Sequence, residues 1–167
     1  FQGNSEIVEF NEFQYFTEVE VLPNTAFDQC RNLTNITLPN SISSIEGGSW
    51  KEHAAFRYCT SLKYIDLPSN LEKIGSTSFF GCTGICRFIL PSSIIYIGEQ
   101  AFNRNVDLGT MEYFIIKSTI PPQLSNANSF DHTDNCPIYV PDISLESYKS
   151  ATNWSKLSSR LKPLSSL

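Results

Sequence analysis

Residues 56–75 read FRYCTSLKYIDLPSNLEKIG, and their apolar residues follow neither of the common secondary-structure periods. The apolar positions are spaced by three, three, three, two, four and three residues, at Phe56, Cys59, Leu62, Ile65, Leu67, Leu71 and Ile74. A half-buried strand alternates apolar and polar residues, and an amphipathic helix repeats its apolar residues about every 3.6 positions. The stretch therefore predicts neither a lone strand nor a lone helix.

The same pattern recurs along the chain at a fixed interval. Residues 79–98 read FFGCTGICRFILPSSIIYIG, in which Phe79 and Pro91 each follow their counterparts in the first stretch by 23 positions. A further, decaying copy starts at Phe102, after the same interval, and keeps apolar residues at Leu108, Met111 and Tyr113 while losing the proline.

An earlier copy starts at Phe27. Its distance from Phe56 exceeds the period by six residues, which fall in EGGSWKEHAA (46–55). We interpret this insertion as a surface loop, which a repeat protein can absorb without losing its core.

Repeats of about 20–29 residues with an L-x-x-L-x-L core predict a solenoid, because one unit cannot bury its apolar face alone and neighbouring units must stack. In each unit we expect a short strand, such as 62–67, that ends at a proline because proline cannot donate to a ladder. The predicted fold is a leucine-rich-repeat solenoid with short parallel strands on one side, an irregular or short-helical opposite side and a C-terminal capping helix.

The full pattern F-x-x-C-x-x-L-x-x-I-x-L-P-x-x-I-x-x-I-G resembles the BspA-like (Treponema-type) leucine-rich repeat family. The resemblance covers residues 27–113 strongly and both flanks loosely. It implies a bacterial cell-surface or secreted protein, of a family associated with adhesion to host proteins and other cells.

We expect one domain over residues 1–167, with an atypical N-terminal capping unit at 1–26, core repeats at 27–113 and a degenerate repeat with a cap at 114–167. Terminal units of a solenoid must shield the core from water. The sequence Ile138 to Val140 predicts a last strand that stops at a proline.

A short helix follows that last strand. We expect Asp142 or Ser144 to cap it and the helix to run to about Ser150. Its apolar face at Leu145, Tyr148 and Ala151 would pack on the last coil, and Trp154 would pack onto this cap rather than bind a ligand.

Three of the five cysteines, Cys30, Cys59 and Cys82, occupy the same repeat position, which Asn105 takes in the next copy. Stacking places them in a column with about 4.7–4.9 Å between neighbours. Because the spacing is equal along the column, it favours no particular pair of cysteines for a disulfide. We expect free, buried thiols. Cys86 and Cys136 have no partner that the sequence identifies.

Net charge and the length of the apolar runs argue against some classes of function. Seventeen acidic residues against twelve basic ones give a net charge of −5, which argues against nucleic-acid binding. No apolar run approaches the roughly 18–20 residues of a membrane span. The chain starts FQGNSE without methionine, as a trimmed mature fragment would, so we expect an extracellular or cell-surface location with the signal or anchor segment absent from this chain.

Motifs for catalysis are missing from the sequence. There is no G-x-S-x-G elbow, no H-E-x-x-H and no glycine-rich phosphate loop, so we expect no enzyme activity, no catalytic residue and no cofactor. His132 with Asp131 and Asp134 is a conceivable metal site, but polar residues in one loop are usually just solvated. The sequence also lacks the two C-x-x-C pairs that would indicate a zinc site. We expect no metal.

The strand residues that point outward are the candidate binding residues, because equivalent positions align across coils into ladders. One ladder is expected to hold Asn35, Tyr64, Arg87 and Thr110, and the other Thr37, Asp66, Ile89 and Glu112. Exposed aromatic and arginine side chains concentrate binding energy at protein interfaces. An ordinary solvated sheet face remains the alternative. Trp50 in the insertion is expected to form a rim of the site or to cover the core.

Two functions follow. The favoured one is a non-enzymatic, surface-exposed binding or adhesion module whose partner is an unknown protein or cell-surface ligand, with a host extracellular-matrix protein as one candidate. The alternative is a structural spacer that displays another domain and has no ligand of its own.

Overall fold

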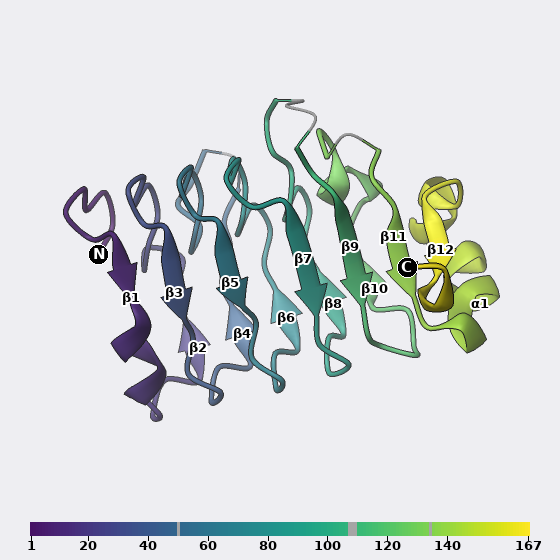
Figure 1. The fold of residues 1–167 in the computed structure, drawn as a ribbon, viewed down its shortest axis with the longest axis horizontal. Helices are drawn as coiled ribbons and strands as arrows, with labels where there is room; N and C mark the ends of the chain where they lie inside the picture. Colours follow the sequence, from purple (N-terminus) through teal and green to yellow (C-terminus); the bar gives the residue numbers. More distant parts are fainter. Residues whose placement is uncertain (50, 107–109, 134) are drawn as a thin grey trace.

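The computed structural model describes residues 1–49, 51–106, 110–133 and 135–167. The chain winds into successive coils that stack side by side from the N-terminus to the C-terminus (Figure 1). Each coil contributes a strand to one row and, through most of the molecule, a shorter strand to a second row behind it. The predicted parallel solenoid is confirmed.

The front row carries the longer strands, all parallel to their neighbours. It forms two separate sheets in the described part of the chain. The first holds β1 (Glu9–Phe10), β3 (Asn35–Thr37) and β5 (Tyr64–Asp66). The second holds β7 (Arg87–Leu90), β9 (Tyr113–Ile116), β11 (Ile138–Val140) and β12 (Leu161–Pro163).

The back row is more regular than the sequence predicted. It is a continuous parallel sheet of two-residue strands, β2 (Val21–Leu22), β4 (Ser44–Ile45), β6 (Lys73–Ile74), β8 (Tyr96–Ile97) and β10 (Gln123–Leu124). Each strand buries its second residue and exposes its first to varying degrees. These strands are too short to give a recognisable alternation in the sequence.

A column of stacked aromatic rings fills the space between the rows. Consecutive ring centroids lie 5.2–5.7 Å apart along Phe1, Phe27, Phe56, Phe79, Phe102, Phe130 and Trp154. From Phe27 to Phe102 the interplanar angles between neighbours are only 5–7°. All of these rings except Phe1 are buried, and burying each contributes about 1.5–3 kcal/mol, which explains why the first residue of the repeat is phenylalanine.

The coil that starts at Phe102 departs from the predicted template. Arg87 pairs with Tyr113 and Phe88 with Phe114, so the strand begins three positions later than the period predicts. Met111, Phe114, Ile115 and Ile116 are therefore buried in this part of the unit. Tyr113 is not a core position, and Leu108 lies outside the described residues. Asn105 is exposed and does not take the cysteine position, because the coil leaves the template after Arg104.

The C-terminal end is closed by α1 (Leu145–Ser150) and the 3₁₀ helices η3 (Asp142–Ser144), η4 (Trp154–Leu157) and η5 (Leu164–Ser166). The helix and its packing are confirmed: Tyr148 is buried and its hydroxyl donates to the Ser118 carbonyl at 2.9 Å. Trp154 is also buried and donates to Pro122 O at 2.8 Å.

The predicted side-chain cap is wrong. The Ser144 hydroxyl donates to Thr119 O, and Asp142 accepts from Ser165 instead of from the helix. Both side chains tie the cap to neighbouring segments. At the N-terminal end, η1 (Asn11–Tyr15) follows β1 within residues 1–26. Nearer the C-terminus, η2 (Ala127–Phe130) brings Phe130 into the aromatic column. The division into cap and core repeats stays a prediction.

Candidate binding site on the strand face

The front row is interrupted between β5 and β7. Within the described ranges no ladder pair and no backbone hydrogen bond joins these two strands. The same two coils are joined elsewhere: Phe56 N–H donates to Ser78 O at 2.9 Å, and β6 pairs with β8 in the back row. The opening is therefore confined to the strand face.

The inward side chains on the two sides of the opening differ. The inward residue of β3 and of β5 is isoleucine, Ile36 and Ile65, whereas in β7 it is Phe88. The Phe88 ring packs at 4.7 Å from Phe102 and stacks on Phe114 at 5.5 Å, centroid to centroid. The change of size alone does not open a ladder, since Phe10 pairs with Ile36 and Phe114 with Ile138 in closed junctions of this row. Ile65 is half-buried, whereas Ile36 is buried.

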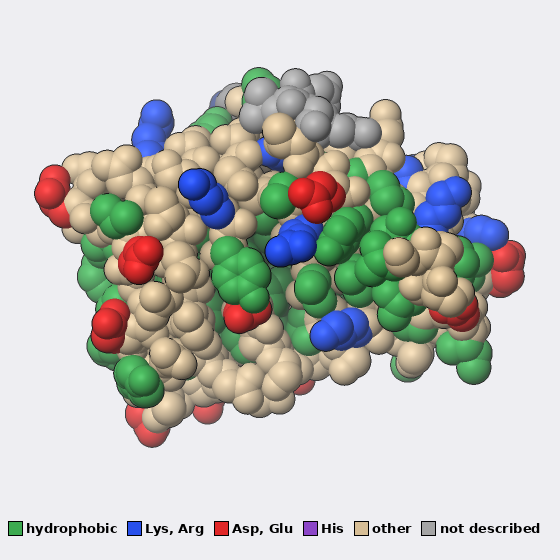
Figure 2. Space-filling view, viewed as in Figure 1, with side chains coloured by type: hydrophobic (Ala, Val, Ile, Leu, Met, Phe, Trp, Pro, Cys, Tyr) green, Lys and Arg blue, Asp and Glu red, His purple; other side chains and the backbone are tan. Residues whose placement is uncertain are grey.

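A groove of about 310 Å³ lies at this opening. Its floor includes the half-buried Ile65 and Leu67, and its rims carry all four central residues that the sequence predicted. Those residues are Tyr64, Asp66, Arg87 and Ile89. Figure 2 shows hydrophobic and basic side chains close together near the middle of this face.

On the β5 rim, the Tyr64 hydroxyl donates to Asp66 Oδ1 at 2.7 Å. This hydrogen bond is the main cause that raises the pKa of Tyr64, with the nearby Asp66 charge next. The phenol therefore stays neutral at physiological pH and holds the carboxylate beside it. Tyr64 is 50% exposed, so most of its ring is available for contact.

On the opposite rim, Arg87 and Lys117 are exposed and neither forms an ion pair with any residue that the structure describes. A hydrogen bond with the Tyr113 side chain is the main cause that raises the pKa of Arg87, which stays charged. Ile89 is 44% exposed between them. The groove thus has two cations and one carboxylate in a protein whose net charge is −5.

The remaining predicted ladder residues lie outside this groove. Asn35 and Thr37 pair with Tyr64 and Asp66 on the closed side of β5, and Thr37 Oγ1 donates to Asn11 Oδ1 at 3.2 Å. They extend the same face toward the N-terminus but do not line the opening.

The ladder positions predicted for Thr110 and Glu112 are wrong. Tyr113 lies beside Arg87 and Ile115 beside Ile89, because the coil contains three more residues before its strand. The Thr110 hydroxyl accepts from Arg104 at 2.8 Å, and Glu112 N–H donates to Cys86 O. Matching RFIL (87–90) to YFII (113–116) through their phenylalanines would have found this register and, with it, Lys117.

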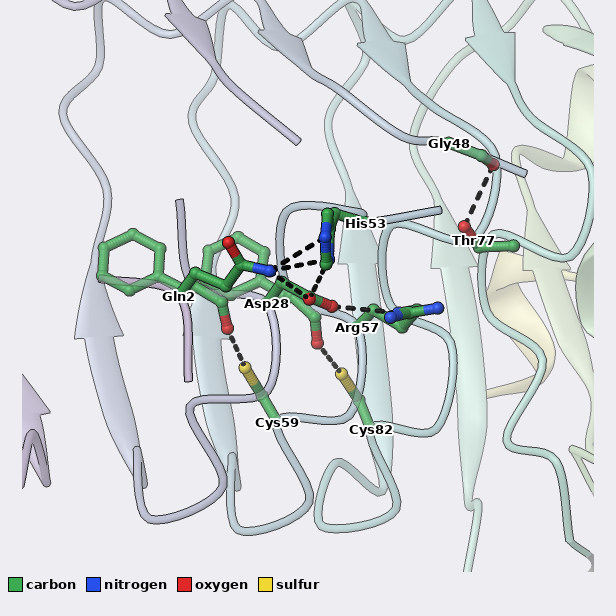
Figure 3. A network of polar contacts seen from close by, with 10 residues as sticks. Gln2, Asp28, Gly48, His53, Arg57, Cys59, Thr77 and Cys82 are labelled. Atoms are coloured by element: carbon green, nitrogen blue, oxygen red, sulfur yellow. Dashed lines mark hydrogen bonds and ion pairs between the residues drawn. The ribbon is translucent and has the colours of Figure 1, made fainter. Parts of the chain in front are cut away.

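The predicted rim residue Trp50 lies outside the described residues. The rest of its loop is held by a buried carboxylate: Asp28 is fully buried and accepts from His53 Nδ1 at 2.6 Å and Arg57 Nε at 2.9 Å. Gln2 also reaches His53, so three side chains converge on one site (Figure 3). A buried carboxylate is costly unless paired, so this cluster fixes the insertion against the first coils.

The three equivalent cysteines are free and buried in a column, as predicted. Each thiol donates to the carbonyl of the first residue of the preceding coil, at 3.0–3.1 Å: Cys30 to Phe1, Cys59 to Phe27 and Cys82 to Phe56. Figure 3 shows the bonds of Cys59 and Cys82. Burial raises the pKa of Cys59, and it raises that of Cys82 to about 12. These thiols are protonated structural groups and not nucleophiles.

Cys86 and Cys136 likewise form no disulfide within the part of the chain that the structure describes. Cys136 is buried, six residues after Phe130, in the position that Leu62 holds after Phe56. Among the described residues no group of three or more histidine, cysteine or acidic side chains is arranged to hold a metal ion. Asp134 of the loop considered above lies outside them. No helix in the described part is long and apolar enough to span a membrane.

Comparison with known proteins agrees with this architecture. A family model described as a BspA type leucine-rich repeat region matches residues 5–135 in six copies. No curated protein gives a significant match. A solved leucine-rich repeat protein from Bacteroides ovatus is similar, with a TM-score of 0.52 and 20% identity. The match covers 87% of this chain and 42% of that protein, and at this identity it shows the fold alone.

Proposed function

Since the chain belongs to the BspA-type leucine-rich repeat family, we propose that it is a non-enzymatic protein-binding module whose partner lies across the strand face at the β5–β7 groove. The family suggests protein–protein interaction, and the location rests on one observation. The four outward residues chosen from the sequence line a hollow where the strand ladder is open.

The chemistry of the groove supports recognition. Tyr64 and Arg87 belong to the residue types that concentrate binding energy, and Ile65, Leu67 and Ile89 offer apolar surface next to them. Strand residues are held by the stacked coils, so their side chains lose less entropy on binding than loop residues would.

We further propose that the binding serves adhesion outside the cell or at its surface. The resemblance of the repeats to proteins of that kind supports this step. A host extracellular-matrix protein or a cell-surface ligand is the candidate partner.

The test starts with a panel of purified extracellular-matrix proteins and cell-surface glycans, measured by surface plasmon resonance. For a partner found in this way, Tyr64→Ala and Arg87→Ala should each weaken binding by more than about fivefold. Lys73→Ala in β6, on the back row, is the matched control and should bind like the parent. Melting temperatures of all three variants should stay within about 2 °C of the parent, because the side chains are exposed.

Two outcomes would count against the proposal. If both strand-face variants bind like the parent, this face is only scaffold and recognition lies on another surface. If no member of the panel gives saturable binding, the spacer alternative is favoured, since a spacer needs no ligand of its own.

A further inference from the structure

Main-chain groups on both sides of the β5–β7 groove point into the opening. Successive residues of a strand direct their N–H and C=O groups to opposite sides. In β7 and β9 the second strand residue directs its groups toward the following coil, as Lys117 N–H to Leu90 O and Phe114 N–H to Pro137 O show. The equivalent residue of β5 is Ile65, which therefore faces the groove, and among the described strands none pairs with its main-chain groups on that side.

The β7 edge has the same property. Lys117 N–H donates to Leu90 O at 3.0 Å, so Phe88 and Leu90 face β9. Arg87 and Ile89 therefore direct their N–H and C=O groups toward the groove, where no backbone partner meets them within the described chain. An open strand edge of this kind is a template for another extended segment.

The charges at the opening are unequal. The β7 side carries Arg87 and Lys117, neither of them in an ion pair with a described residue, while the β5 side carries Asp66, which already accepts from Tyr64. A segment lying along β7 meets two cations, so an acidic side chain is favoured there. A basic segment would gain only the carboxylate that Tyr64 holds.

We propose that the groove binds an extended acidic peptide segment of a partner protein, which adds as a strand to the β7 edge and places a carboxylate between Arg87 and Lys117. This inference deepens the proposed function and rests on it. The groove volume of about 310 Å³ is at the low end of the range of about 300–1,000 Å³ typical of ligand sites, which suits a short stretch of backbone with one or two side chains.

The probe is a blocked hexapeptide of alternating valine and glutamate, titrated into the ¹⁵N-labelled protein at low salt. Amide resonances of Arg87 and Ile89 should shift most and those of β6 on the back row should stay in place. A valine–lysine hexapeptide should bind at least about tenfold more weakly, because it lacks the carboxylates. The glutamate peptide N-methylated at alternate residues should also lose about tenfold, because it cannot donate to the strand edge.

Variants test separately how much the charges of Arg87 and Lys117 contribute to peptide binding. Arg87→Gln and Lys117→Gln should each weaken the glutamate peptide, and Lys73→Gln should not. Arg87→Glu combined with Lys117→Glu should reverse the preference in favour of the lysine peptide. All of these residues are exposed, so folding is checked by circular dichroism and is expected to be unchanged.

The inference is overturned if the N-methylated and parent peptides bind equally, or if the shifted amides lie away from the groove. Failure to bind the glutamate peptide at millimolar concentration also overturns it. The proposed function survives these results if a protein of the panel still depends on Tyr64 and Arg87. The proposed function fails together with the inference only if substitutions of Tyr64 and Arg87 also leave binding of that protein unchanged.

Discussion

Two neighbouring junctions of the front row differ in whether their strands pair. Between β7 and β9 four residue pairs are in register, and Phe88 stacks on Phe114 with an interplanar angle of 6°. Between β5 and β7 no pair forms in the described part of the chain, and an isoleucine stands next to a phenylalanine. The junction of β3 and β5, isoleucine on isoleucine, is again closed with three pairs. A change of side-chain size does not by itself open the ladder, because Phe10 pairs with Ile36 and Phe114 with Ile138 in closed junctions. What differs at the open junction is that Phe88 packs toward the β9 side, while Ile65 is left half-buried.

The largest expected effect separates a closed junction from the open one. Ile36→Ala should lower the free energy of unfolding by about 2–5 kcal/mol, because it empties a buried site between closed strands. Ile65→Ala removes the same atoms from a half-buried site and should cost only about 1–2 kcal/mol. Urea unfolding of the matched pair gives the comparison. Equal losses would mean that the ladder at β5 is as closed as at β3.

A second test uses the opposite side of the same two coils, where the structure is closed. Burial raises the pKa of Cys82 from its ordinary value of 9.0 to about 12, so the folded state favours the thiol. Its stabilising contribution is complete below about pH 9 and is lost as the pH rises toward 12, because the unfolded thiol then ionises.

Unfolding free energies measured from pH 8 to 11 should therefore fall, and less so in Cys82→Ala, which lacks the ionisable group. At pH 8 a maleimide reagent should label Cys59 and Cys82 far more slowly in the native protein than in urea. Rapid native labelling would show that the opening extends through the whole coil and is not confined to the strand face.

Much of this fold follows from the sequence because stacked repeats place chemically equal residues in equal positions. The column of cysteines was predicted from its spacing, and so were the outward positions of Tyr64 and Arg87. The register beyond Phe102 was not, since a fixed period cannot reveal three extra residues within a coil.

The groove and the Asp28 cluster could not be predicted, for a different reason. The open ladder is a matter of three-dimensional packing, in which Phe88 lies against Phe102 and Phe114 while Ile65 across the groove stays half-buried. Asp28 and His53 lie far apart in the sequence and meet only because the insertion folds back on the first coils. Spacing rules describe what repeats share, and these features are where the repeats differ.

Hydrogen exchange along β7 tests the central claim most directly. The amides of Phe88 and Leu90 face β9 and should be protected, whereas those of Arg87 and Ile89 face the groove and should exchange much faster. Equal protection of all four amides in the parent protein would contradict the open ladder and, with it, the proposed site.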